Sequence, residues 1–84
     1  MMQGERHTLV LPDLGLGDAP IAVSLWLAPI GRSVVEGDPL LELIAGDVTV
    51  DLPAPASGIL VEQRVEEDDL VQVGQVLGVI IGAE

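Results

Sequence analysis

The sequence predicts an all-β fold, a sandwich or barrel built from short strands. Apolar residues alternate with polar ones over short runs, which is the period of a strand with one buried face. Valine and isoleucine, which favour strands, dominate these runs, and glycine or proline interrupts them every few residues. A long amphipathic helix pattern appears nowhere. The 84 residues suffice for one domain at most.

The first part of the chain contains two expected strands and the loop between them. One strand is expected over 7–11 and ends at Pro12, which lacks the backbone N–H that a strand interior needs. Residues 14–20 hold two glycines and a closing proline, so we expect a loop there. The second strand is expected over 21–27, where both faces carry apolar residues, and the proline and glycine of 29–31 end it.

The chain is organised around a predicted β-hairpin centred on the turn 45–47. Apolar residues over 40–44 lead into this turn, and apolar and polar residues alternate over 48–52 after it. Such a pattern on both sides of a glycine is typical of a hairpin. The Pro-Ala-Pro-Ala-Ser-Gly stretch at 53–58 then takes the chain out of the sheet, because proline has no N–H to donate and glycine permits positive φ.

Turn signals also separate the remaining strands. The first strand of the hairpin, over 39–44, follows a turn at 36–38. We expect another strand over 58–65, an acidic turn at 66–69, and a last strand over 75–81. In the strand over 58–65, the residues expected to be available for burial are Ile59, Val61 and Val65.

An internal repeat accompanies these strands. The motif Val-x-x-Gly-x-x-Leu occurs at 34–40 and again at 71–77, an offset of 37 residues. The shared glycine and the aliphatic strand after each copy favour a duplicated supersecondary unit. Two such halves are expected to pack their apolar faces about a pseudo-two-fold axis. The hairpin tip at Asp47 then projects at one end, and the acidic turn 66–69 lies near the chain termini or beneath them.

The charge balance excludes several classes of partner. The chain has fourteen acidic side chains, three arginines and no lysine, which gives a formal charge of −11. This charge repels nucleic-acid phosphates and anionic membranes. The same charge favours a basic protein partner approached by electrostatic steering. The apolar runs are far shorter than the ~20 residues of a transmembrane helix, and the N-terminus lacks a signal-peptide layout. We therefore expect a cytoplasmic protein with neither nucleic acid nor membrane as its partner.

No constellation of residues predicts catalysis. The chain has no cysteine, so no disulfide or thiolate metal site is available, and His7 stands alone without a nucleophile or base. The acidic turn 66–69 lacks the spaced oxygen ligands of a calcium loop, and no helix follows the glycines of 15–17 to bind a phosphate. Trp26, the only aromatic residue, is expected to pack in the core. The sequence thus predicts neither catalytic nor metal-binding residues.

Several motifs together resemble the lipoyl (biotinyl/lipoyl-attachment) domain family. The opening Leu-Pro-Asp-Leu-Gly at 11–15, Trp26, and Gly-Asp-Pro-Leu at 37–40 are similar to segments of that family. The stretch 48–58 resembles the second strand and exit of its attachment hairpin almost residue for residue, and 71–77 resembles its closing half. The resemblance implies a flattened β-barrel of two four-stranded antiparallel sheets with pseudo-two-fold symmetry, a barrel-sandwich hybrid.

The resemblance also implies kinship with the carrier domains of 2-oxo acid dehydrogenase acyltransferase components. In those domains a lipoyl-lysine at the hairpin tip carries acyl groups and reducing equivalents between active sites. The implied partners are therefore the proteins of such complexes. A single domain is expected over 7–84, and the polar residues 1–6 are expected to be disordered.

The hairpin tip departs from the pattern of the family. Asp47 stands where the family has its acceptor lysine, Gly46 stands in place of an acidic residue, and Ala45 replaces the usual threonine or serine. Ile44 and Leu16 also replace acidic residues that the family usually carries. A carboxylate cannot form an amide with lipoate or biotin, and the chain contains no lysine. We therefore expect no attached cofactor.

The sequence leaves four functions open. The favoured hypothesis is a non-catalytic module with a protein-interaction or structural role, related to acyl-carrier domains but unable to be lipoylated or biotinylated. A swinging-arm carrier is the alternative if the native gene has a lysine at position 47. An adaptor domain of a transport assembly is a third hypothesis, which a helical insert in the full-length gene would favour. A small-molecule-binding protein is the fourth, and its sign is a pocket large enough for a ligand.

Overall fold

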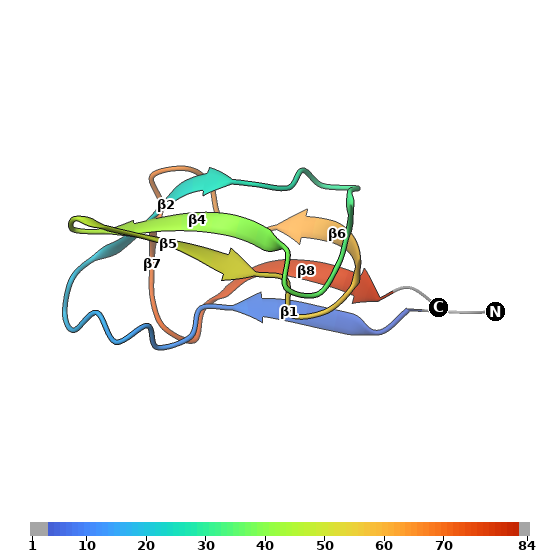
Figure 1. The fold of residues 1–84 in the computed structure, drawn as a ribbon, viewed down its shortest axis with the longest axis horizontal. Helices are drawn as coiled ribbons and strands as arrows, with labels where there is room; N and C mark the ends of the chain where they lie inside the picture. Colours follow the sequence, from blue (N-terminus) through green and yellow to red (C-terminus); the bar gives the residue numbers. More distant parts are fainter. Residues whose placement is uncertain (1–3, 83–84) are drawn as a thin grey trace.

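A computed structural model describes residues 4–82 of the chain as β-strands joined by turns and loops (Figure 1). The strands are β1 (Arg6–Val10), β2 (Ile21–Trp26), β3 (Ser33–Val34), β4 (Pro39–Ala45), β5 (Val48–Pro53), β6 (Gly58–Gln63), β7 (Leu70–Val71) and β8 (Val76–Gly82). The prediction of an all-β chain is confirmed. Within residues 4–82 no helix is long and apolar enough to cross a membrane.

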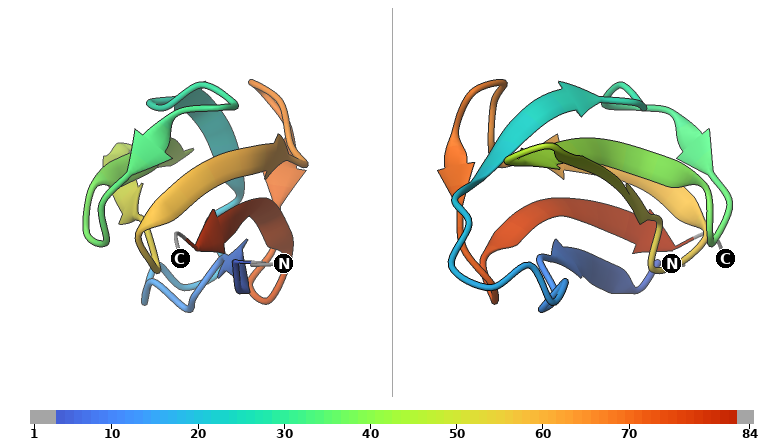
Figure 2. Two further views of the ribbon diagram at one scale, coloured as in Figure 1. Left: turned by 90° about the vertical axis from the view of Figure 1, so that its right-hand side faces the viewer. Right: turned by 60° about the vertical axis from the view of Figure 1, so that its left-hand side comes forward.

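The strands form two four-stranded antiparallel sheets, as the family resemblance implies. One sheet has the order β1-β8-β6-β3, and the other has the order β5-β4-β2-β7. The two sheets curve around one hydrophobic core, so the molecule is a flattened barrel (Figure 2). The β4–β5 hairpin lies at one end of this barrel, and the start of β1 and the end of β8 lie at the other end (Figure 1).

The predicted pseudo-two-fold symmetry is present in the strand order. Half of the strands lie in each sheet. If each strand of β1-β8-β6-β3 is replaced by the strand four places further along the chain, counting on from β8 to β1, the order becomes β5-β4-β2-β7, which is the order of the second sheet. Both sheets also carry a register shift at the same place, between Val23 and Leu25 in β2 and between Leu60 and Glu62 in β6. These shifts are 37 residues apart, which is the offset of the sequence repeat.

Side-chain hydrogen bonds follow the same symmetry. The Trp26 indole Nε1–H donates to the Val65 carbonyl at 2.9 Å, and the Gln63 amide Nε2–H donates to the Ala28 carbonyl at 2.9 Å. Trp26 and Gln63 are equivalent positions in the repeat, and so are Ala28 and Val65. Each half of the chain therefore satisfies a partly buried side-chain donor with a carbonyl of the other half.

Aliphatic side chains fill the core. The largest fully buried side chains are Leu11, Leu40, Leu41, Leu43, Leu60, Leu77, Ile80, Val23 and Val79. Trp26 is partly buried and packs against this core, which confirms its predicted packing role. In the part of the chain that the structure describes, no polar or charged residue is buried. The fold thus depends on apolar burial and backbone ladders, and the polar chemistry lies on the surface.

The predicted burial of Ile59 is wrong. Ile59 is 38% exposed, whereas its neighbour Leu60 is fully buried. Gly58 and Leu60 are both buried and lie two residues apart, so the strand period of two places them on the inner face. Apolar residues occupy consecutive positions here, so the sequence pattern alone did not determine which face was buried. Val65, by contrast, is buried as predicted.

The short strands β3 and β7 are absent from the sequence prediction. Each has only two residues, which is too short for alternation to show. Each ends at the valine of the repeated motif, Val34 or Val71. These valines pair with Gly58 in β6 and Ile21 in β2, respectively, at equivalent positions of the two sheets. The repeat therefore marks the edge strands that the alternation pattern misses.

The predicted place of the acidic turn 66–69 is also wrong. This turn lies on the hairpin half of the barrel, away from the termini (Figures 1 and 2). The Asp68 N–H donates to the Val23 carbonyl at 2.8 Å, and the Val23 N–H donates to the Asp69 carbonyl at 2.8 Å. The two-fold relation explains the position, because the turn equivalent to it is 29–32, which bonds β6 in the other half.

β1 begins one residue before the expected strand. Arg6 pairs with Ile81, and the Gly82 N–H donates to the Glu5 carbonyl at 2.7 Å. The strand thus includes Arg6, the last residue of the segment 1–6 expected to be disordered. Residues 1–3 and 83–84 lie outside the described part of the chain.

Candidate functional site

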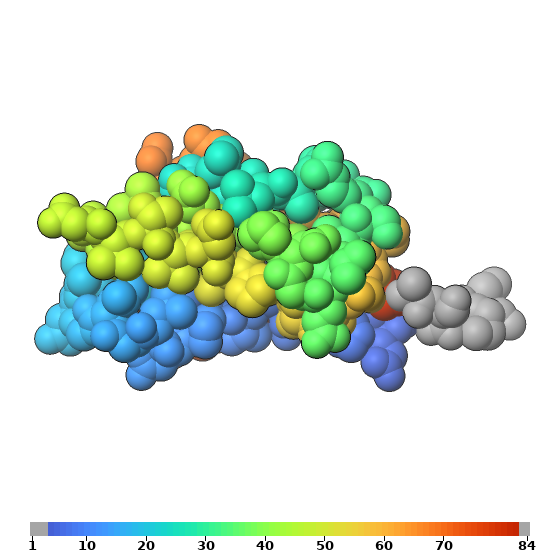
Figure 3. All heavy atoms as spheres, in the orientation of Figure 1, coloured from blue at the N-terminus to red at the C-terminus, as the bar shows by residue number. Residues whose placement is uncertain are grey.

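The sequence resemblance places the candidate site at the tip of the β4–β5 hairpin. The structure brings Ala45, Gly46 and Asp47 together there, as predicted. The hairpin stays in register up to the pair Ala45–Val48, so only Gly46 and Asp47 connect the strands. Ala45 is 5% exposed and Gly46 and Asp47 are exposed. The hairpin projects at the end of the molecule opposite the start of β1 and the end of β8 (Figure 3).

The turn at the tip has the backbone of a type II′ turn. Gly46 has a φ of 60°, and Asp47 does not share the positive φ. A positive φ at the first of two central residues defines type II′, which matches the twist of the flanking strands and favours glycine at that position. A Cβ at Gly46 would meet open space. Glycine is therefore needed there for its conformation and not for its small size.

Asp47 presents an unpartnered carboxylate at this tip. Among the described residues it makes no hydrogen bond and no ion pair. An ionised carboxylate only accepts hydrogen bonds, so it offers no nucleophilic nitrogen for acylation. The tip can therefore expose a negative charge to a partner.

The outer face of the hairpin sheet carries two carboxylates opposite each other. Glu42 on β4 pairs with Asp51 on β5, and like charges at directly opposed positions destabilise a sheet. The Ser24 hydroxyl donates to Glu42 Oε1 at 2.9 Å, which satisfies one of the two carboxylates. Asp51 lies on the edge strand β5, where charge discourages pairing with another sheet.

Replacing one of these carboxylates is expected to stabilise the fold. Asp51→Lys removes the repulsion and adds an attraction to Glu42, so we expect a gain of roughly 1 kcal/mol in the free energy of unfolding. Urea denaturation measures the change. Asp51→Asn, which only removes the repulsion, should give a smaller gain at low salt. A loss of stability in Asp51→Lys would contradict the pairing of Glu42 with Asp51.

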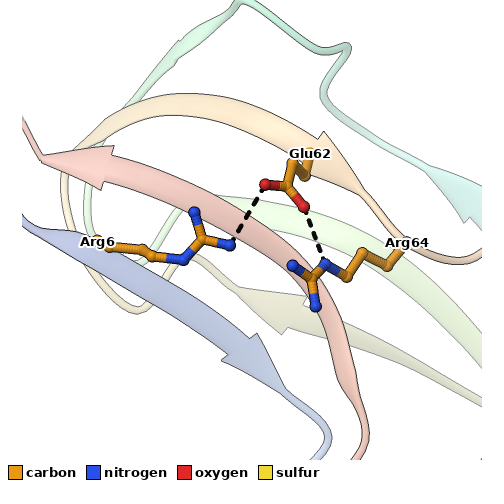
Figure 4. Close-up of polar contacts among 3 residues, drawn as sticks. All are labelled: Arg6, Glu62 and Arg64. Atoms are coloured by element: carbon orange, nitrogen blue, oxygen red, sulfur yellow. Dashed lines mark hydrogen bonds and ion pairs between the residues drawn. The ribbon is translucent and has the colours of Figure 1, made fainter.

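Two arginines hold one glutamate on the other sheet. Glu62 on β6 accepts hydrogen bonds from Arg6 at 3.3 Å and from Arg64 at 2.9 Å, and the Arg6 bond crosses β8 (Figure 4). Val79 of β8 lies between Thr8 and Glu62 in the ladder and is fully buried, although it is outside the main core cluster. The side chains of this bridge therefore cover an apolar residue on the outer face of the sheet.

The same contacts make the contribution of Glu62 to the stability of the fold depend on pH. The hydrogen bond from Arg64, together with the charges of Arg64 and Arg6, lowers the pKa of Glu62 below its ordinary value of 4.5. A carboxyl whose pKa is lowered by folding stabilises the fold at pH values above its unfolded pKa, and this contribution is lost as the pH falls through the lowered pKa.

We therefore expect the wild type to have a higher Tm than Glu62→Gln at neutral pH. This difference should shrink as the pH falls below 4.5, the ordinary pKa of the carboxyl. Thermal melts of both proteins over a pH series measure it. High salt should also reduce the difference, because the three side chains are exposed to solvent and salt screens exposed charges. A difference that is constant in pH would contradict the role of the ion pairs.

The other residues considered in the sequence have structural contacts. His7 Nε2 lies 3.4 Å from Glu5 Oε2 near the chain termini. The Glu66 N–H donates to Asp69 Oδ2 at 2.8 Å, which closes the acidic turn. The Gly15 N–H donates to Asp13 Oδ1 at 2.9 Å, and the loop leads into a strand. Within residues 4–82 no group of three or more histidine, cysteine or acidic residues could hold a metal ion.

Sequence reasoning missed surface features that join segments distant in the chain. One is the bridge between Glu62 and its arginines, whose members are far apart in the chain. Another is a groove of about 320 Å³ between residues 17–21 and 70–73. A comparison of the two repeats could have drawn attention to it, since Leu70 and Val73 stand where the first half has serine and glutamate.

The biotin–lipoyl family model, described as "Biotin-requiring enzyme", matches residues 7–80. The chain belongs to this biotin–lipoyl family. The match begins in β1 and ends in β8, so it includes the β4–β5 hairpin and its tip. The family resemblance seen in the sequence motifs is therefore confirmed.

Acyltransferase components are among the similar curated proteins. The chain is 35% identical over 74 residues to the dihydrolipoyllysine-residue acetyltransferase component of the pyruvate dehydrogenase complex of Corynebacterium glutamicum, covering 88% of the chain and 11% of that protein. It is 36% identical over 70 residues to the succinyltransferase component of the 2-oxoglutarate dehydrogenase complex of Bartonella vinsonii, covering 83% and 17%. For the acetyltransferase component of the acetoin cleaving system of Pseudomonas putida, identity is 32% over 78 residues, covering 93% and 21%. The chain thus spans between 11% and 21% of the length of these relatives.

Solved structures of carboxylases share the fold. A single-chain, multi-domain long-chain acyl-CoA carboxylase matches with a TM-score of 0.75 and 23% identity, over 94% of this chain and 7% of that one. The urea carboxylase of Kluyveromyces lactis matches with a TM-score of 0.78 and 18% identity, over 96% of this chain and 7% of that one. At such low identity the likeness concerns the two-sheet barrel alone.

Proposed function

We propose that this domain is a non-covalent protein-interaction module that binds a component of a 2-oxo acid dehydrogenase-type complex without carrying lipoate or biotin. The observation that carries the proposal is the hairpin. Its strands, register and projecting tip are intact, while the tip presents Asp47 and the chain contains no lysine.

The side chains of this domain lack an acceptor for either cofactor. Lipoate and biotin attach through an amide, which requires an amine that loses its proton, and the lysine ε-amine supplies it. The three arginines remain protonated, and they belong to residues 6, 32 and 64, none of which is at the hairpin tip. The tip therefore supports a role in recognition better than a role in group transfer.

The partner class is inferred from the relatives. The similar proteins are components of the pyruvate dehydrogenase complex, the 2-oxoglutarate dehydrogenase complex and the acetoin cleaving system. The family match over residues 7–80 supports a partner among the components of such complexes. The two-residue connection of β4 to β5 favours this module over a transport adaptor, since such adaptors resemble lipoyl domains that are usually split around a helical hairpin.

Two measurements test the proposal. Co-expression with a lipoate ligase, and separately with a biotin ligase, should leave the intact mass of the wild-type domain unchanged, whereas an authentic lipoyl domain gains mass. Purified decarboxylase, acyltransferase and lipoamide dehydrogenase components should then be tested for binding by calorimetry. A lipoyl or biotinyl mass on the wild type, or binding to none of the components, would refute the proposal.

A further inference from the structure

A groove on the hairpin half of the barrel is built from the β1–β2 connection and β7. It has a volume of about 320 Å³ and lies between residues 17–21 and 70–73. Ile21 pairs with Val71, so the sheet holds the two segments side by side, and they are neighbours in both views of Figure 2. The equivalent surface of the other half provides an internal comparison.

The β1–β2 connection that lines the groove is longer than its equivalent in the other half. This connection runs from residue 11 to residue 20, whereas the equivalent β5–β6 connection runs only from 54 to 57. In the shorter one, the Glu36 N–H donates to the Ser57 hydroxyl oxygen at 2.8 Å, which ties the two segments together. At the equivalent positions stand Val73 and Pro20, which cannot make such a side-chain hydrogen bond.

Apolar side chains are exposed at the groove where the other half has polar ones. Leu70 is 71% exposed and Val73 is 57% exposed. The equivalent positions hold Ser33 and Glu36. The strand pairing is the same in both halves, since β3 and β7 pair with β6 and β2 in equivalent registers. The fold therefore does not require apolar residues at these positions, and exposed apolar residues beside a groove mark an interaction site.

The surroundings of the groove are acidic. Asp18 lines it, and the acidic turn 66–69 directly precedes Leu70. Among the described residues that line it, none is an arginine. In the other half, Arg32 occupies the position equivalent to Asp69. The two halves thus differ at this place in both polarity and charge, and the groove combines exposed apolar side chains with a negative rim.

We propose that this groove binds a segment of a partner protein in which apolar side chains are flanked by lysine or arginine. The apolar side chains of the partner segment cover Leu70 and Val73, and its lysine or arginine side chains face Asp18 and the acidic turn 66–69. Apolar burial supplies the core of such an interface, and the opposed charges at its rim select the partner and speed its association. The inference rests on the proposed interaction function and names the surface that performs it.

A display library of random peptides, selected on the immobilised domain, tests this groove. We expect the enriched sequences to combine leucine, isoleucine or valine with lysine or arginine. A synthetic peptide of the enriched sequence should shift the amide NMR signals of residues 17–21 and 70–73. The double variant Leu70→Ser with Val73→Thr should lower the affinity of the domain for this peptide at least about tenfold. Val35→Gln, which removes a 62% exposed valine in the other half, should leave binding unchanged.

A second pair of variants tests the charge. Asp18→Asn should lower the affinity for the peptide by roughly two- to fivefold at low salt, while Glu36→Gln in the other half should leave the affinity unchanged. Enrichment of no peptide, of acidic peptides, or of peptides whose NMR shifts lie elsewhere would overturn the groove proposal. So would a dimer in light scattering that the double variant abolishes, because the occupant would then be a second copy of the chain.

The outcomes also separate this proposal from the proposed function. If purified complex components bind the wild type and the double variant equally, the interaction function stands and the groove proposal fails. If no component binds while the selected basic peptides still require Leu70 and Val73, the groove proposal stands and the assignment to a dehydrogenase-type complex fails.

Discussion

Asp47→Lys is expected to make this domain a substrate of a lipoate ligase, giving a product heavier by one lipoyl group in intact-mass spectra. The reason is the position of the residue. Asp47 is exposed at a tip that projects from the barrel (Figure 3), and its carboxylate holds no contact that the change would break. The new amine would lie where the family resemblance places the acceptor, on the turn between two strands that are paired up to Ala45 and Val48.

A second lysine on the same hairpin provides the control. Asp51→Lys adds the same amine to the exposed face of β5, away from the tip, and it should stay unmodified under the same conditions. If a folded Asp47→Lys stays unmodified, then recognition surfaces beyond the tip have been lost, or the tip is not equivalent to the attachment point. If both variants are modified equally, the ligase does not distinguish a lysine at the tip from a lysine elsewhere on the hairpin.

Gly46 is kept unchanged in this test because of its backbone. Gly46→Asp, which restores the acidic residue that the family carries before its lysine, would place a side chain at a φ of 60° in a type II′ turn. We expect it to lower the free energy of unfolding by about 1 kcal/mol or more, or to change the turn type. Gly46 therefore departs from the residue pattern of the family at a position where the backbone of this turn favours glycine.

Much of the fold could be predicted from local patterns. Alternation and turn residues located the longer strands, and the repeat of 37 residues predicted a symmetry that extends to register shifts and hydrogen bonds. The strands β3 and β7 were missed because two residues cannot show a period. The acidic turn 66–69 was misplaced because its position depends on how the two halves pack, which no local pattern encodes.

The candidate site was easier to predict than its surroundings. Ala45, Gly46 and Asp47 are adjacent in the chain, so a hairpin pattern is enough to bring them to one tip. The Glu62 bridge and the groove at Leu70 join segments distant in the chain, and only the sheet order places them together. Features that depend on pairing between distant strands were therefore beyond the reach of the sequence pattern, except where the repeat could be compared with itself.

Leu60→Ala and Ile59→Ala are expected to have very different effects, although the residues are neighbours of similar size. Leu60 is fully buried in the core, so its truncation leaves a cavity and should cost about 2–5 kcal/mol in the free energy of unfolding. Small domains have only roughly 5–15 kcal/mol in total, so Leu60→Ala should shift the urea midpoint strongly or leave the domain unfolded.

Ile59→Ala provides the matched measurement, because Ile59 is 38% exposed on the opposite face of β6. We expect a loss of about 1 kcal/mol or less, since part of the side chain is already in contact with water. The comparison tests the register directly: a shift of β6 by one residue would bury Ile59 and expose Leu60. If Ile59→Ala were the more damaging change, the strand would face the core as the sequence pattern suggested, and the equivalence of β6 with β2 would be wrong.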